Sequence, residues 1–325
     1  MQEWLRGGQR PTGVERMDGR WDLRGFELTQ PSRSGRSGYE IAEVEDIFQP
    51  RDVSWSGLDL RFSSIPALRL TNANIEWCLF DQAMLTDLRM WATKVKDCSF
   101  VGAALRESAL STGDQAGVCR WEDVDFDRAD LRGSHFLGGQ ILRCSFRDAK
   151  LDEVNFLQTD IDGVLFSGEV RGVLFDQRVI ASIRPTSKVI KNADFSGAVF
   201  DNSEFLGCRF ENVSWPDGIM VVPYFRLVVA RVMSYLVGND SVEARLARAA
   251  LAGWVKAPGV ADSPDVAPDS TGIVNLADLS TYGSEDAAVL LEKLIRRARE
   301  ELALPVLGHP HPDGRDIGTG EVSAR

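Results

Sequence analysis

The sequence has few of the residues from which catalytic and metal sites are usually built. Its 325 residues include three histidines, five cysteines and four tyrosines. It contains no glycine-rich phosphate-binding loop, no nucleophile elbow and no paired metal-ligand spacing. Asp123, Asp125 and Asp127 alternate along one stretch, but outward carboxylates explain them better than an acid/base pair does. The sequence therefore predicts a protein that is not an enzyme and has no catalytic residue, cofactor or metal.

Long apolar runs and clustered basic charge are also missing. No run approaches the roughly 18–20 apolar residues of a membrane span, and the start of the chain has no apolar signal segment. The net charge is −11, and segment 51–215 contains 19 basic and 24 acidic residues that are interspersed. A nucleic-acid-binding surface would show a clustered basic patch. We therefore expect a cytoplasmic protein that binds neither a membrane nor, directly, a nucleic acid.

What the sequence does contain is an apolar residue at every fifth position over half of its length. In "CSFRDAKLDEVNF" (144–156) these residues are Phe146, Leu151 and Phe156. Five residues leave about 140° of drift on a helix and change sides on a strand, so the backbone must turn within each five. Short sides joined by turns form a coil, and stacked coils form a solenoid. The inward residues form three runs, from Trp55 to Leu110, from Trp121 to Phe166 and from Phe195 to Trp215.

The number of sides can be predicted from which residues resemble one another. If every fourth inward residue is taken, at a period of about 20 residues, residues of similar type fall into the same column. This is expected if each coil has four sides, because residues of one column then stack on successive coils. The columns imply about eight coils, or roughly 38 Å at the spacing of strand layers. The predicted columns are Leu60, Phe80, Phe100, Ala116, Phe136, Phe156, Phe175, Phe195 and Trp215; Leu70, Met90, Leu110, Leu131, Leu151, Val170, Ile190 and Phe210; and Trp55, Ile75, Val95, Trp121, Ile141, Ile161, Ile180 and Phe200.

The units "ADLRG", "AKLDE", "ADFSG" and "AVFDN" resemble the A(D/N)LXX unit of pentapeptide repeat proteins. The resemblance covers about residues 51–217. It implies that family's fold, a right-handed quadrilateral β-helix, so we expect an all-β solenoid of this kind with a C-terminal α-helical extension. Quinolone-resistance members of the family protect DNA gyrase by resembling DNA in shape and charge.

Two functions therefore remain open. The missing active site and the general behaviour of solenoids favour a non-catalytic scaffold whose rigid outer faces bind a protein partner. The alternative is DNA-mimicking protection of DNA gyrase, which requires a continuous acidic surface and a dimer. Arg128, Arg132 and Arg143 interrupt such a surface, and the long C-terminal extension departs from the compact family pattern.

The cysteines and histidines fit the repeat. Every cysteine lies two residues before an inward centre, where side chains must be small, so the thiols should be buried and unreactive. Cys78 and Cys98 are one coil apart with parallel side chains, a geometry that does not favour a disulfide. His135 should point outward. His309 and His311 lie in a Pro/Gly-rich stretch that predicts a disordered tail over 306–325. The cysteines are Cys78, Cys98, Cys119, Cys144 and Cys208.

Three places disturb the ladder. "STGDQAGVCR" (111–120) adds one residue, which predicts a bulge near Gly113 or Gly117. "SGEVRGVLF" (167–175) drops one. Around 181–188 an excursion should replace one side of a coil, and basic residues surround it. These residues form either a solvated loop or a contact loop: Arg178, Arg184, Lys188 and Lys191.

The segments outside the repeat should cover its ends. Residues 1–50 are expected to cap the first coil, and 218–256 to form a helical C-terminal cap with a helix over 224–237. A second helix should start at the pair Asp240 and Glu243 and reach Lys256. A linker over 257–283 then leads to a helix over 284–305, for which Ser284 is the predicted N-cap.

One row of outward residues is apolar where other faces are polar, and exposed apolar strips usually mark contacts. We expect this leucine stripe to be covered by a C-terminal helix, or else by a protein partner or a second copy of the chain in a homodimer. Scattered leucines without a role are the remaining alternative. The stripe consists of Leu79, Val101, Leu137, Leu157 and Leu174.

Overall fold

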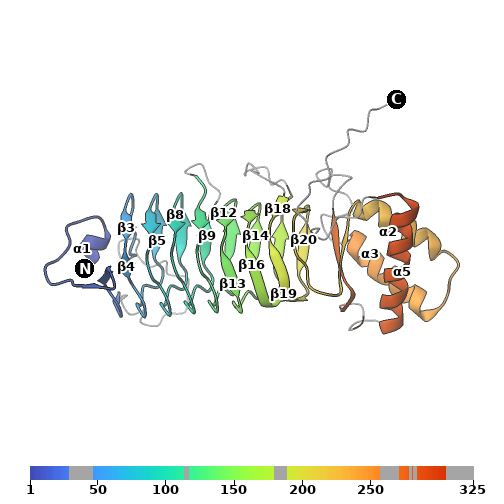
Figure 1. The fold of residues 1–325 in the computed structure, drawn as a ribbon, viewed down its shortest axis with the longest axis horizontal. Helices are drawn as coiled ribbons and strands as arrows, with labels where there is room; N and C mark the ends of the chain where they lie inside the picture. The colour runs from blue at the N-terminus through green and yellow to red at the C-terminus, as the bar shows by residue number, and fades with distance from the viewer. Residues whose placement is uncertain are drawn as a thin grey trace, which may run out of the picture.

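The computed structural model describes residues 1–28, 47–112, 117–178, 189–256, 271–277, 280 and 284–304. It shows a rod of stacked coils with a group of helices at its C-terminal end (Figure 1). The rod is a right-handed quadrilateral β-helix, as the repeat predicts. One of its sides is an eight-stranded parallel sheet, which confirms the expected number of coils.

Two of the four faces are regular parallel sheets. The first face consists of β3 (Ser54–Ser56), β6 (Asn74–Glu76), β8 (Lys94–Lys96), β10 (Arg120–Glu122), β12 (Gln140–Leu142), β15 (Asp160–Asp162), β18 (Val189–Lys191) and β21 (Arg209–Glu211). The fourth face consists of β5 (Arg69–Thr71), β7 (Arg89–Trp91), β9 (Ala109–Ser111), β11 (His135–Leu137), β14 (Asn155–Leu157), β17 (Leu174–Asp176) and β20 (Glu204–Leu206).

The other two faces are held in their N-terminal halves by single bridges. On the second face the bridges link Asp59, Leu79, Ser99, Asp125 and Ser145 in that order. On the third face they link Glu27, Ser64, Met84, Ala104, Asp130 and Lys150. In the C-terminal half, β13 (Ser145–Arg147), β16 (Leu165–Arg171) and β19 (Asp194–Asp201) pair in parallel. β16 and β19 run across the corner between these faces, and the dropped residue at 167–175 falls in β16.

Tight turns form the corners. In the first coils the amide of the residue three positions after a centre donates to the centre's carbonyl, as from Ala83 to Phe80 at 3.0 Å. The residue before this donor has left-handed backbone, with φ of 58° at Gln82. Side chains tolerate this conformation only at some cost, and Asn tolerates it better than most residues. Asn72 and Asn192 occupy such corners with φ of 52° and 50°.

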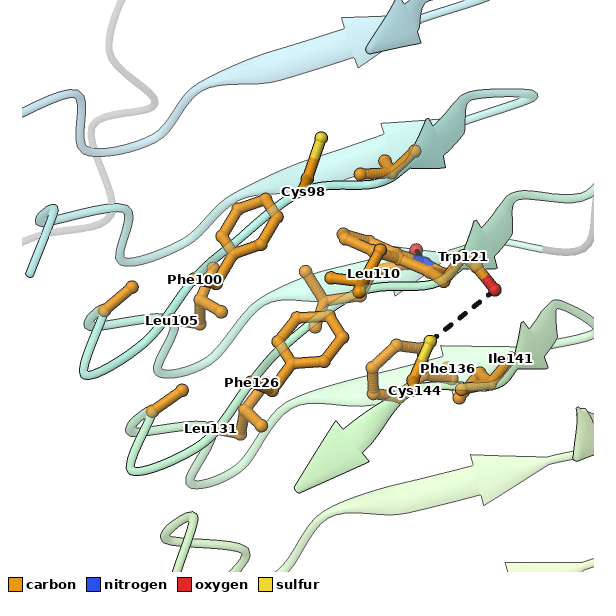
Figure 2. Close-up of a cluster of buried hydrophobic side chains, with 14 of the residues drawn as sticks. Cys98, Phe100, Leu105, Leu110, Trp121, Phe126, Leu131, Phe136, Ile141 and Cys144 are labelled. Atoms are coloured by element: carbon orange, nitrogen blue, oxygen red, sulfur yellow. Dashed lines mark hydrogen bonds between the residues drawn. The ribbon is translucent and has the colours of Figure 1, made fainter. Parts of the chain in front are cut away.

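The core consists of inward side chains stacked coil on coil, but the predicted columns are wrong after the third coil. Figure 2 shows Phe100 next to Phe126 and Leu105 next to Leu131. The rings of Phe100 and Phe126 are 5.4 Å apart, whereas Phe136 stacks on Phe156 at 5.1 Å on a different face. The cause is that the chain between β9 and β10 contains extra residues. Ala116, the predicted centre there, lies outside the described residues. Phe126 follows Phe100 by 26 residues instead of 20.

A second insertion lies between β17 and β18 and shifts the columns again. Phe175 stacks on Phe205 at 4.5 Å, and Phe195 stacks on Phe166 at 4.8 Å. In the Trp55 column, Ile161 is therefore followed by Ile190. Ile180 lies outside the described residues. Both insertions lie between a strand of the fourth face and the next strand of the first face.

The N-terminal segment packs on the first coil. It contains α1 (Gln2–Leu5), β1 (Arg16–Met17) and β2 (Arg20–Asp22), and β2 pairs in parallel with β4 (Leu58–Asp59). The indole nitrogen of Trp55 donates to the Leu5 carbonyl at 2.9 Å. Leu5, Leu23 and Phe48 are buried in the same core as the rod.

The helices have a separate core. β22 (Ile219–Val222) and β23 (Gly272–Asn275) form an antiparallel pair beside α2 (Phe225–Tyr235), α3 (Val242–Lys256) and α5 (Glu285–Glu301). The Ser284 hydroxyl caps α5, as predicted, by accepting from the Ala287 amide at 3.0 Å. The cap of α3 is Ser241 instead of Asp240, and it accepts from Ala244 at 3.1 Å. None of the described helices is long and apolar enough to cross a membrane.

The helices α2, α3 and α5 lie beyond the last coil and not along the rod (Figure 1). Their buried residues form one hydrophobic cluster, and those of the rod form another. The expected cover of the leucine stripe by a C-terminal helix is therefore wrong for every described helix. The apolar faces of α2, α3 and α5 pack against one another instead.

Candidate functional site

The leucine stripe is split between two faces. Leu137 and Leu157 lie next to each other in register on β11 and β14 of the fourth face. Leu174 is on the same face but pairs with Asn155, in the other row. Leu79 and Val101 flank Phe80 and Phe100 on the second face. The single stripe is therefore wrong, and the column shift at the first insertion is the reason.

The fourth face has an uncharged centre. His135, Leu137, Asn155 and Leu157 point outward there and are half-buried. Burial lowers the pKa of His135, and the positive charge of Arg89 lowers it further, so the imidazole is neutral near pH 7. Arginines lie on this face toward its N-terminal end, and carboxylates lie on it toward its C-terminal end.

The predicted contact loop is only partly described. Arg178 holds the buried carboxylate of Asp176 through two contacts, of 2.9 Å from Nε and 2.6 Å from Nη2. This hydrogen bonding raises the pKa of Arg178. Lys191 lies 3.3 Å from the Glu211 carboxylate. Arg184 and Lys188 lie outside the described residues. Two of the four basic residues are thus paired with carboxylates of the rod.

Two buried glutamines at the second insertion are not foreseen from the sequence. The Gln158 amide donates to the carbonyl of Arg178, and the Gln177 amide donates to the carbonyl of Thr159 at 2.7 Å. Both side chains are about 1% exposed. Their positions in the repeat are ordinary corner positions, so no sequence signal distinguishes them. They fix the point at which the chain leaves the regular coil.

Ion pairs cover the middle of the first face. Arg143 contacts Glu122 at 2.6 Å and Asp123 at 2.8 Å. Hydrogen bonding to Arg143 lowers the pKa of Asp123. Positive and negative charges therefore alternate on this face, and a continuous acidic strip is absent from its described part.

The second face has a different electrostatic character. Asp125 and Asp127 flank Phe126, and the Asp125 carboxylate accepts a hydrogen bond from the Asp127 amide at 2.8 Å. Burial raises the pKa of Asp125, and the negative charge of Asp127 raises it further. No Lys or Arg of the described chain forms an ion pair with Asp125. This face has unbalanced carboxylates that the alternating sequence pattern alone does not distinguish.

The five cysteines are buried and none forms a disulfide, as predicted. Burial raises the pKa of Cys144 to about 12 and also raises that of Cys208. Cys78 is shifted in the same direction by burial, whereas hydrogen bonding with Cys78 lowers the pKa of Cys98. Among the described residues, no three His, Cys, Asp or Glu side chains are grouped closely enough to hold a metal ion.

The thiols should therefore resist modification in the folded protein. With an excess of a disulfide-exchange reagent that releases a coloured thiol, we expect no cysteine to react at pH 8 over the period in which urea-unfolded protein reacts completely. Absorbance of the released thiol measures the reaction. Rapid reaction of two or more native cysteines would show that their inward placement is wrong.

The repeats match a known family. The family model for pentapeptide repeats matches residues 142–168 and 190–214, with eight copies. No curated protein matches the sequence. Among solved structures, HetL from the cyanobacterium Nostoc sp. strain PCC 7120, a pentapeptide repeat protein involved in heterocyst differentiation regulation, is 16% identical. The match covers 61% of this chain and 90% of HetL, with a TM-score of 0.24.

Two further structures are similar at the same level. A trypsin-treated form of QnrB1, a plasmid-mediated fluoroquinolone resistance protein, is 16% identical, with 47% of this chain and 89% of QnrB1 covered and a TM-score of 0.21. Rfr23 from the cyanobacterium Cyanothece 51142 is 10% identical, with 51% of this chain and 90% of Rfr23 covered and a TM-score of 0.20. At these TM-scores the likenesses carry no argument about what this chain binds.

Proposed function

Because this chain belongs to the pentapeptide repeat family, we propose that it is a non-catalytic scaffold whose rigid outer faces bind a protein partner. The observation that supports this function most directly is the continuous, fully buried core. Phe136, Phe156 and Phe175 are 0% exposed and stack face to face at about the spacing of the coils. Such a core holds the outward side chains at fixed positions along the rod, which favours binding without rearrangement.

The fourth face is the first candidate for this binding. Leu137 and Leu157 lie side by side at its uncharged centre. Neither side chain belongs to the inward core of the rod, so the stability of the rod does not require them to be apolar. The two insertions begin at the adjacent corner, one before and one after this centre. Half-buried apolar residues are typical of the middle of an interface.

Changing Leu137 and Leu157 together to lysine should abolish this binding while the fold survives. Each side chain is half-exposed, so a lysine can reach solvent, whereas two charges at an interface core are costly to desolvate. Proteins crosslinked to the wild-type chain and to the double variant in its native host should be compared by quantitative mass spectrometry. Light scattering on both proteins measures a homodimer through the same face.

A matched control places the same charges elsewhere. Ser54 and Asn74 to lysine alters two outward positions that are adjacent in register on the first face. We expect a partner that is lost with the leucine variant and kept with this control. If both variants keep the same crosslinked proteins and the same molecular mass as the wild type, the fourth face is not the binding face.

DNA gyrase protection remains the alternative function. It requires a carboxylate surface that imitates the DNA backbone, whereas the carboxylates of the first face are paired with arginines such as Arg143. A gyrase supercoiling assay in the presence of a quinolone tests it directly. Restored supercoiling on addition of this protein would favour gyrase as the partner, and unchanged inhibition would reject it.

A further inference from the structure

Exposed apolar side chains on the rod gather at its N-terminal end. Phe62, Met84 and Trp77 are 62%, 52% and 45% exposed, and all three belong to the first two coils. In the remaining described part of the rod, the only large apolar side chains of comparable exposure are Val118 and Val199, which are far apart in the chain. A soluble protein gains nothing in stability from a cluster of exposed large side chains, so their concentration indicates contact with another molecule.

These residues lie on the second face, at its corners or on the adjoining third face. The Phe62 amide donates to the Asp81 carbonyl at 3.0 Å, and the Ser64 hydroxyl contacts the Met84 sulfur at 3.9 Å. Leu79 follows Trp77 by two residues and bridges to Ser99, which places Val101 on the next coil of the same face. We call the following residues the N-terminal apolar patch: Phe62, Trp77, Leu79, Met84 and Val101.

Trp77 is held in place within this patch. Its ring lies where a side chain at Gly57 would be, 3.0 Å from an ideal Cβ. The Arg20 guanidinium stacks on the ring at 4.3 Å and donates through Nε to the Trp77 carbonyl at 3.0 Å. The patch therefore has a fixed aromatic border, which lowers the entropy cost of binding.

Carboxylates without a cation follow the patch on the second face. Asp81 accepts from the Ser99 hydroxyl and from the Val101 amide at 3.1 Å, and Asp125 accepts from the Asp127 amide. Neither Asp81 nor Asp125 is within 4.0 Å of a Lys or Arg nitrogen in the described chain. On the same rod, Asp59 and Asp130 are paired with arginines at 2.6 Å and 2.7 Å. The two unpaired carboxylates are complementary to a cation supplied from outside.

The spacing fits a helix. Leu79, Ser99 and Asp125 lie on successive coils, so Asp125 is about 10 Å along the rod from Leu79 at the strand spacing. Residues i and i+7 of a helix lie on the same face and are about 10.5 Å apart. A helix with apolar side chains at i, i+3 and i+4 and basic side chains at i+7 and i+8 would place the apolar group over the patch and the basic group beside Asp125.

From these observations we infer that the N-terminal apolar patch and the adjacent carboxylates bind a basic amphipathic helix of a protein partner. The inference rests on the proposed scaffold function and assigns its partner a chemistry. Apolar residues of the helix cover Phe62, Leu79 and Met84, and its lysines or arginines pair with Asp125. The binding is weakened by salt because part of the contact is between charges.

The experiment uses the full chain and a fluorescein-labelled synthetic helix with leucines at i, i+3 and i+4 and lysines at i+7 and i+8. We expect the fluorescence anisotropy to saturate with wild-type protein. Phe62→Ala and Asp125→Asn should each weaken binding by at least about fivefold. A second peptide with glutamates in place of the lysines should bind no variant.

Matched controls separate specific binding from general attraction to an acidic protein. Val199→Ala removes an equally exposed apolar side chain, and Asp152→Asn removes a carboxylate on the third face. Both should bind the lysine peptide as the wild type does. Circular dichroism should show that all four proteins are folded.

Any other result overturns the inference. No binding by the wild type, equal weakening by the control variants, or equal binding of the glutamate peptide would each do so. Binding gained only when residues 29–46 are deleted would assign the patch to that segment of the chain. The proposed function survives such a failure, since it is tested separately at Leu137 and Leu157.

Discussion

Replacing Phe156 with alanine should lower the free energy of unfolding by about 3–5 kcal/mol, the usual cost of truncating a buried aromatic residue. Phe156 is 0% exposed and stacks between Phe136 at 5.1 Å and Phe175 at 5.0 Å. It also meets Phe146 and Phe166 edge to face, at 6.1 Å and 5.9 Å. The truncation removes contacts in three coils and leaves a cavity that the rigid coils cannot close.

Urea unfolding followed by circular dichroism measures this loss. The next residue provides the control, because Leu157 is half-exposed on the outside of the same strand. Leu157→Ala should cost less than about 1 kcal/mol. A loss of less than about 1 kcal/mol for Phe156→Ala would show that the phenylalanine column does not carry the stability of the rod.

The sequence predicts the rod well because each coil imposes a local requirement. An inward centre must be apolar, and the residue two positions before it must be small. Both requirements recur every five residues, whichever residue of the neighbouring coil stacks on that centre. Trp121 and Ile141 are assigned correctly for this reason. Which residues stack depends on the number of residues per coil, and an insertion changes that number. The local pattern gives no sign that the coil between Phe100 and Phe126 is longer than the others.

The candidate surfaces are predicted less well, because the outward residues that lie next to each other depend on how successive coils stack. Leu137 and Leu157 are placed together correctly, since no insertion separates them. Leu79 is assigned to their face only through the wrong column. The N-terminal apolar patch could have been found from one signal. Phe62 and Trp77 each lie two residues after an inward centre, at a left-handed corner where a large aromatic residue has no role in the core.

The ion pairing of the outward carboxylates on the second and third faces has no equivalent in the sequence pattern. Asp125 and Asp130 both precede an inward centre, but only Asp130 has an arginine two residues later on the same coil that reaches its carboxylate. Asp127 has its cation on the following coil, in Arg147. Which carboxylates remain without a cation is therefore decided by side-chain reach between coils, and it can be determined only from the structure.

Gly272→Ala should destabilise the helical end of the molecule by about 1–3 kcal/mol and leave the rod unchanged. A Cβ at Gly272 would lie 2.3 Å from two ring carbons of Phe225, at the start of α2. Phe225 is 8% exposed and packs in the helical core, so its ring cannot move away without displacing neighbours. The effect should stay local because the buried residues of the helices and of the rod form separate clusters.

Hydrogen exchange measured by mass spectrometry distinguishes the two regions. Peptides from α2 and β22 should exchange faster in the variant, and peptides from β11 and β14 should exchange at the wild-type rate. Gly253→Ala is the matched control, because this glycine of α3 has no heavy atom within 4 Å of an added Cβ. A helical alanine in open space should be neutral or stabilising by up to about 1 kcal/mol. Faster exchange throughout the rod in the Gly272 variant would instead mean that the helices and the β-helix unfold as one cooperative unit.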